Sequence, residues 1–95
     1  MAKVFKYQLP ISDAVKVYMP KDAKVLCVQV QNGQPCIWAS VNPDKELEER
    51  QFRIAGTGHT IEDGIVDNYI GTVQLHDGKL VFHVFEVRYE KDDVQ

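Results

Sequence analysis

The stretch KVLCVQVQNGQPCIWASV, residues 24–41, consists of two apolar runs on either side of Asn32-Gly33. Asn-Gly between apolar runs is a strong signal for a β-hairpin, because both central residues of a type I′ turn need positive φ angles, which Asn and Gly tolerate best. The stretch therefore predicts two antiparallel strands joined by a tight turn, and an antiparallel sheet as the frame of the fold.

The turn also sets the register of the two strands. Counting outward from it, the predicted pairs are Gln31 with Gln34, Gln29 with Cys36, Cys27 with Trp38 and Val25 with Ser40. Side chains alternate between the faces of a strand. One face is therefore aliphatic and predicted to join the core: Leu26, Val28, Val30, Ile37, Ala39 and Val41. The opposite face is mixed and carries the only tryptophan of the chain, Trp38.

Outside this hairpin, short apolar alternations are separated by Pro and Gly, which is typical of further strands. The predicted strands are residues 3–9, 14–19 and 52–54, and a second hairpin of residues 69–76 and 79–89. The second hairpin turns at Asp77-Gly78. Its register pairs Leu75 with Leu80, Val73 with Phe82 and Gly71 with Val84 on one face, and Gln74 with Val81, Thr72 with His83 and Ile70 with Phe85 on the other.

The second strand of that hairpin, residues 80–87, is apolar on both faces, so we expect it to be central or to offer its outer face to a partner. Residues 42–51 are strongly charged and are predicted to connect strands, with one helical turn opened by Pro43-Asp44.

About seven short strands predict an all-β protein, a small single-domain antiparallel β-sandwich or partly open barrel. We expect the β domain to span residues 1–89, with residues 90–95 as a frayed acidic tail. Ninety-five residues bury only about 60 to 68% of the surface of the unfolded chain, so assembly with a second copy would help stability.

Composition excludes several classes of function. The net charge of −3 gives no electrostatic reason to bind nucleic acid. No stretch has the roughly 20 apolar residues of a membrane helix, and the amino terminus lacks a secretory signal, so we expect a cytoplasmic protein. Cys27 and Cys36 are diagonal neighbours in the predicted register and are expected as unpaired thiols, and no metal set or cofactor motif is present.

The Gly56-Thr57-Gly58-His59 loop is the first candidate site. Its amides, the Thr57 hydroxyl and the His59 ring, with Arg50 and Arg53 near in sequence, suit a phosphate or carboxylate. The alternative is that two glycines around a threonine are simply what a tight bend between strands requires. The loop lacks the spacing and the lysine of a phosphate-binding P-loop, so both interpretations stay open.

Trp38 is the second candidate. It either stacks on a flat ligand or an interface, or it closes a small secondary core with Cys27 and Cys36. His83 is expected to be a satisfied, half-buried ring. Of the functions considered, catalysis has the least support. No Ser or Cys lies in a sequence pattern typical of a nucleophile, and His59 with Glu62 or Asp63 makes only a weak acid–base pair.

Four blocks together, KVFKYQLP, VQVQNGQPCIWASVNP, FRIAGTGHTI, and YIGTVQL with VFHVFE, resemble a family of small, uncharacterised phage and prophage proteins. The resemblance covers nearly the whole chain and implies no established active site. It implies a phage-encoded protein in the host cytoplasm that acts by binding. The first hypothesis is a homo-oligomer that sequesters a small anionic ligand, such as a nucleotide-derived defence signal. The alternatives are a module that binds a host protein or serves as a minor phage structural component, and a small hydrolase.

Overall fold

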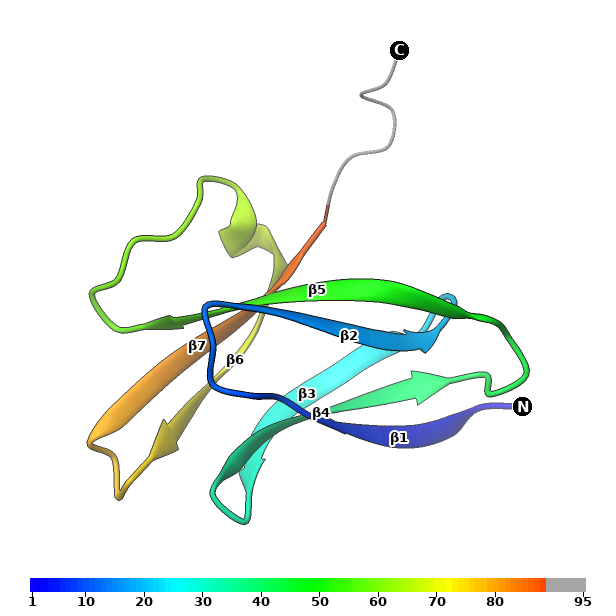
Figure 1. Cartoon of the computed structure of the whole chain (residues 1–95), viewed down its shortest axis with the longest axis horizontal. Helices are drawn as coiled ribbons and strands as arrows, with labels where there is room; N and C mark the ends of the chain where they lie inside the picture. Colours follow the sequence, from blue (N-terminus) through cyan, green and yellow to red (C-terminus); the bar gives the residue numbers. More distant parts are fainter. Residues whose placement is uncertain (89–95) are drawn as a thin grey trace.

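In the computed structural model, which describes residues 1–88, two antiparallel sheets pack face to face (Figure 1). The first sheet has the order β1-β4-β3 and the second the order β2-β5-β7-β6. The elements are β1 Lys3–Gln8, β2 Ala14–Pro20, β3 Lys24–Gln31, β4 Gln34–Val41, β5 Leu47–Gly56, a 3₁₀ turn η1 Ile65–Asn68, β6 Tyr69–Leu75 and β7 Leu80–Val87. The predicted all-β sandwich is confirmed, and the sheets do not close into a barrel. Position 89 and the predicted tail 90–95 lie outside the described residues.

The first hairpin forms as predicted around its turn. Asn32 and Gly33 have φ angles of 54° and 79°, the positive values that a type I′ turn requires. The predicted register is confirmed from Gln31 opposite Gln34 to Cys27 opposite Trp38.

Beyond Cys27 the predicted register is wrong, because a β-bulge lies between Val25 and Cys27. Val25 faces Ala39 instead of Ser40 and packs against the core, while the extra residue, Leu26, is 52% exposed. A bulge adds one residue to a strand and so reverses the faces of all residues beyond it. Val30, near the turn, is also exposed, whereas the other four predicted core residues of the hairpin are buried: Val28, Ile37, Ala39 and Val41.

The second hairpin also keeps the predicted register near its turn and loses it at a bulge. Its predicted register is confirmed from Leu75 opposite Leu80 to Gly71 opposite Val84. The predicted pairing of Ile70 with Phe85 is wrong, because a second bulge at Ile70 brings Tyr69 opposite Phe85. Strand β7 lies between β5 and β6, as expected for a strand with two apolar faces.

The prediction of a charged connection over residues 42–51 is wrong. Strand β5 already begins at Leu47 and pairs with all of β2. Its first half carries three consecutive charged residues, Glu48, Glu49 and Arg50, which conceal the period of two on which strand prediction depends. The expected helical turn is absent from this segment as well: Pro43 and Asp44 form a turn in which the side chain of Asn42 accepts a hydrogen bond from the Asp44 amide at 3.0 Å.

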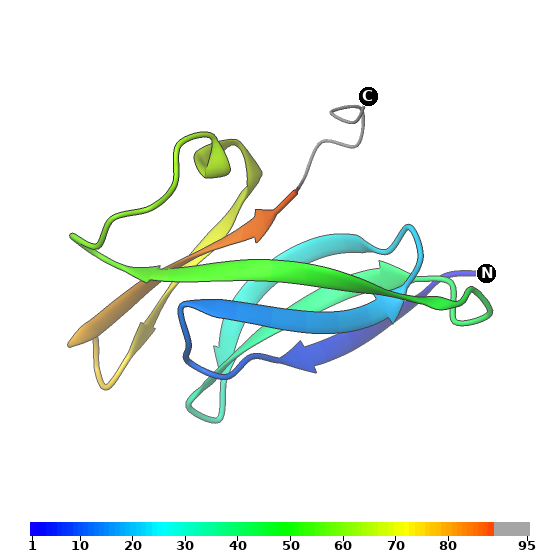
Figure 2. The same cartoon turned by 45° about the horizontal axis from the view of Figure 1, so that its top comes forward.

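The main core lies between the two sheets and includes Leu9, Met19, Ile37, Phe52 and Val84, none of them exposed. A smaller cluster lies on the outer face of the second sheet, where the loop that follows β5, with η1, folds back over β7 (Figure 2). Ile61 and Ile65 cover Phe85 there, leaving it 6% exposed. The outer face of β7 is thus covered at Phe85 by the chain itself.

The free edges of β3 and β6 lie side by side. Gly71 on β6 approaches β3 so closely that an added Cβ atom would lie 2.8 Å from Val28 Cγ1. This contact closes one side of the sandwich without a hydrogen-bonded ladder, and the two bulges lie at the same end of it, at Leu26 on β3 and Ile70 on β6.

Candidate functional site

The two bulges face a common groove of about 600 Å³, which we call the bulge groove. Bulges re-aim side chains and are over-represented at sheet edges and beside binding sites. One wall is the turn into β3 with the start of that strand, and the other is the end of η1 with the start of β6. The lining residues include Lys24, Leu26, Asp67, Tyr69, Ile70, Glu86 and Arg88.

The floor of the bulge groove carries a buried ion pair. Glu86 is 5% exposed and is the only buried charged residue in the part of the chain that the structure describes. Arg50 donates to both of its carboxylate oxygens, from Nε at 2.5 Å and from Nη2 at 3.1 Å, and donates from Nη1 to the Ala23 carbonyl at 2.9 Å. The hydrogen bond with Glu86 is the main cause that raises the pKa of Arg50, so the guanidinium stays charged.

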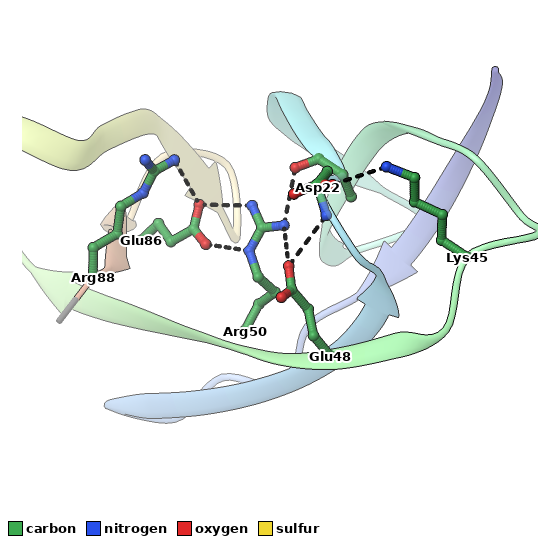
Figure 3. A network of polar contacts seen from close by, with 7 residues as sticks. Asp22, Lys45, Glu48, Arg50, Glu86 and Arg88 are labelled. Carbon is green, nitrogen blue, oxygen red and sulfur yellow. Dashed lines mark hydrogen bonds and ion pairs between the residues drawn. The ribbon is translucent and has the colours of Figure 1, made fainter. Parts of the chain in front are cut away.

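Figure 3 shows how this pair extends into a network. Glu48 lies 3.6 Å from Arg50 Nη1 and accepts the Asp22 amide at 3.3 Å. Lys45 donates to the Asp22 carboxylate at 2.8 Å, and this bond is the main cause that lowers the pKa of Asp22. The network therefore ties the turn before β3 to β5 and β7, which holds the groove floor in place.

Two cations at the rim of the bulge groove are exposed and weakly paired. Asp22 and Glu86 each have a cationic partner in this network. Arg88 is 66% exposed, and its one contact among the described residues is the 3.5 Å approach of Nη2 to Glu86. Lys24 and Asp67 are exposed, and within residues 1–88 their side chains form no hydrogen bond or ion pair. Lys24 and Arg88 are thus the cations left at the rim, against Asp67 and against Glu48, which shares Arg50 with Glu86, and they lie beside the apolar surfaces of Leu26 and Ile70.

A second hollow of about 760 Å³, the loop groove, lies between β5, β7 and the loop that precedes η1. Arg53, a predicted site residue, lines it, but its guanidinium is occupied. It donates to the carbonyls of Asp13, Ile54 and Thr60, and its Nε lies 3.4 Å from Glu62. Arg53 therefore anchors the loop to the sheet. Asp67 and Arg88 line this groove as well as the bulge groove, and the further carboxylates of Glu62 and Asp63 make the loop groove the more acidic surroundings for an anion once Arg53 is paired.

The Gly56–His59 loop does not face either groove. Thr57 Oγ1 lies 2.8 Å from His83 Nε2, while Thr72 Oγ1 lies 3.0 Å from His83 Nδ1 and 2.5 Å from the Tyr69 hydroxyl. Both nitrogens of His83 are satisfied, which confirms the prediction for this half-buried ring. Gly58 has a positive φ of 91°, and the His59 ring lies against Gly56, so this geometry supports the tight-bend interpretation of the loop.

Trp38 lies on the outer face of the first sheet, away from every other predicted site residue. It pairs with Cys27 on β3 and Lys6 on β1, and the buried thiol of Cys36 is two positions along β4. Lys6 crosses β4 to donate to Gln31 at 2.6 Å on this face. The arrangement supports the interpretation of Trp38 as part of a small secondary core.

Of the seven predicted site residues, Trp38, Arg50, Arg53, Gly56, Thr57, Gly58 and His59, only Arg50 supports the floor of the bulge groove. Sequence patterns did not identify the residues that line this groove. Leu26 and Ile70 are exposed or half-exposed because of bulges, and no local sequence pattern predicts these bulges. One signal was present in the sequence: Glu86 stands on the core-facing side of β7, and a carboxylate there requires a buried cationic partner.

Residues 1–88 contain no group of three or more His, Cys, Asp or Glu side chains placed to hold a metal ion. The same residues contain no helix long and apolar enough to span a membrane. Comparison with curated proteins and with solved structures gave no match. A family model described as a domain of unknown function, DUF7352, matches residues 1–95, and the chain therefore belongs to this family.

Proposed function

We propose that the protein is a non-catalytic binding protein that captures a small anionic ligand in the bulge groove. The observation that carries the proposal is the pair of facing bulges, which open a groove over the neutralised Arg50–Glu86 pair and leave Arg88 exposed at its rim. A guanidinium binds phosphate or carboxylate in a fork geometry, and Lys24 adds a second positive charge.

The apolar part of the ligand would lie between Leu26, which is 52% exposed, and Ile70, the second bulge residue that lines the groove. An aromatic ring with a charged group attached, as in a nucleotide, matches this combination. The resemblance to phage and prophage proteins supports the finer proposal that the ligand is a nucleotide-derived defence signal and that the protein sequesters it in the host cytoplasm.

Binding without turnover fits the polar groups of the described residues. The His83 ring contacts the hydroxyl of Thr57, the group that a hydrolase would need as its nucleophile. The other ring nitrogen of His83 contacts Thr72 rather than a carboxylate, so the histidine lacks the orienting acid of a catalytic triad. The apolar outer face of β7, which an inhibitor of a host protein would use, is covered at Phe85. These observations favour the small ligand over a hydrolase or a module that uses this face.

The test is isothermal titration calorimetry of the folded protein with a panel of mononucleotides, cyclic nucleotides, cyclic dinucleotides and inorganic phosphate. We expect one class to bind, to shift the amide resonances of Lys24, Leu26 and Tyr69, and to be recovered unchanged by mass spectrometry. Arg88→Ala should weaken binding about tenfold or more, since a charge-assisted hydrogen bond contributes roughly 1.5 to 3 kcal/mol.

The matched control is Lys79→Ala, which removes the same charge from an exposed position outside both grooves. It should leave the affinity unchanged. Failure of the whole panel to bind, or equal losses in Arg88→Ala and Lys79→Ala, would contradict the proposal, and conversion of the ligand would contradict its non-catalytic part.

A further inference from the structure

Four strands have an unpaired edge in the described part of the chain: β1 and β3 in the first sheet, β2 and β6 in the second. Proteins protect such edges with bulges, prolines or charges, because an open edge is a template for another strand. The edges of β3 and β6 face one another and both carry a bulge. Strand β2 ends in Pro20, and its inward residues Val15 and Met19 are already buried.

Strand β1 is the least protected edge. It pairs with β4 over six consecutive residues without a bulge or a proline. It exposes apolar side chains on both faces, since Val4 is 60% and Phe5 is 37% exposed. Phe5 is also absent from the residues that pack against the core.

The lysine in the middle of β1 does not protect this edge. Lys6 Nζ donates to Gln31 at 2.6 Å. Because Gln31 belongs to β3 and β4 lies between β1 and β3, the ammonium group is drawn over its own sheet. The lysine therefore points away from an incoming strand.

We propose that β1 is a self-association edge, on which β1 of a second copy adds antiparallel about a two-fold axis. One register pairs residues 3–7 of both copies of β1 and keeps the core-facing sides of both copies on the same side of the joined sheet. It places Phe5 opposite Phe5 of the second copy, Lys3 opposite Tyr7, and Val4 opposite Lys6. In this register no lysine directly faces another lysine. A shift by two residues in one direction sets Lys6 against Lys6, and a shift by two in the other direction leaves only residues 3–5 of β1 paired.

Pairing in this register satisfies the free backbone groups of β1 and joins two three-stranded sheets into one of six strands, a common size for a sheet. The contact is isologous, as in most homodimers. A single strand pair buries less than the roughly 1,600 Å² of a standard interface. We therefore expect a dimer that dissociates on dilution. This inference is independent of the proposed ligand.

Charges introduced at Phe5 test the proposed register. Sedimentation velocity over a concentration series should show the unmodified protein shifting from monomer to dimer. Phe5→Lys and Phe5→Glu should each weaken dimerisation at least tenfold, because like charges then face each other. An equimolar mixture of the two variants should regain the dimer as a heterodimer, which also proves that both variants are folded.

Tyr18→Lys is the control, since Tyr18 is an exposed aromatic on the other open edge, β2, and this variant should dimerise normally. The proposal is overturned by a protein that stays monomeric at all concentrations, by Phe5 variants that dimerise normally, or by loss of the dimer in Tyr18→Lys alone.

Discussion

At the scale of single residues, the pair Arg50–Glu86 stands out because both side chains are largely removed from water, with exposures of 12% and 6%. Taking two charges out of water is costly, and such a pair is weak evidence for stability by itself. Its geometry nevertheless satisfies both oxygens of Glu86, and Arg50 also holds the Ala23 carbonyl. We attribute its presence to placement of the groove floor, which a hydrophobic pair would leave without polar anchors.

Removal of one member of this pair should lower the free energy of unfolding. Glu86→Gln leaves the buried Arg50 guanidinium with the 3.6 Å approach of Glu48 as its remaining counter-charge, so we expect a loss of about 3 kcal/mol in the free energy of unfolding, measured by urea denaturation. Glu46→Gln, at an exposed position, is the control and should change it by less than about 0.5 kcal/mol. The double variant Arg50→Met/Glu86→Leu should lose less than Glu86→Gln. Equal effects of Glu86→Gln and Glu46→Gln would show that the pair is not buried in solution.

At the scale of elements, the close approach of β6 to β3 decides how the bulge groove is closed on one side. Only glycine at position 71 leaves room for the Val28 side chain, which is itself 6% exposed and part of the core. The contact is steric rather than conformational, because Gly71 is not among the glycines with positive φ angles.

Gly71→Ala should therefore destabilise the protein by about 1 to 3 kcal/mol through overpacking. Val28→Ala in the same chain relieves the clash, so the double variant should lose less than the sum of the two single variants, a non-additivity that thermal or urea unfolding measures directly. Gln74→Ala, at an exposed position on the same strand, serves as the control. Strict additivity of the Gly71 and Val28 changes would contradict the contact.

At the scale of the whole molecule, acid should weaken the fold through carboxylates whose pKa is lowered. The pKa of Asp22 is lowered chiefly by the hydrogen bond from Lys45, and the pKa of Glu49 chiefly by the hydrogen bond from Gln51. A group whose pKa is lower in the folded state stabilises the protein above its unfolded pKa, near 3.9 for Asp, and this contribution disappears as the pH falls through the folded pKa.

Stability should thus decline as the pH falls below about 4, and Asp22→Asn should make the decline shallower. Urea midpoints of the two proteins, measured in steps from neutral to acidic pH, check this. Asp63→Asn, which changes an exposed carboxylate in the loop groove, is the comparison. If the urea midpoint of Asp22→Asn falls with pH as steeply as that of the unmodified protein, Asp22 does not contribute to the loss of stability in acid.

The sequence by itself determined the parts of this protein that depend on local chain geometry. Asn32-Gly33 and Asp77-Gly78 adopt positive φ angles readily, so both hairpins and their registers near the turns follow from neighbouring residues alone. The all-β class follows for the same reason, since period-two alternation and turn residues are local signals.

Only the tertiary structure decided the rest. The bulges at Leu26 and Ile70, the early start of β5 and the burial of Glu86 depend on which strands meet across the sandwich. These contacts between strands bring together residues far apart in sequence, such as Arg50 with Glu86 and Val28 with Gly71. The bulge groove is formed by such long-range contacts. Local sequence patterns therefore indicated a site at the Gly56–His59 turn, whereas the packing of two sheet edges formed the bulge groove elsewhere.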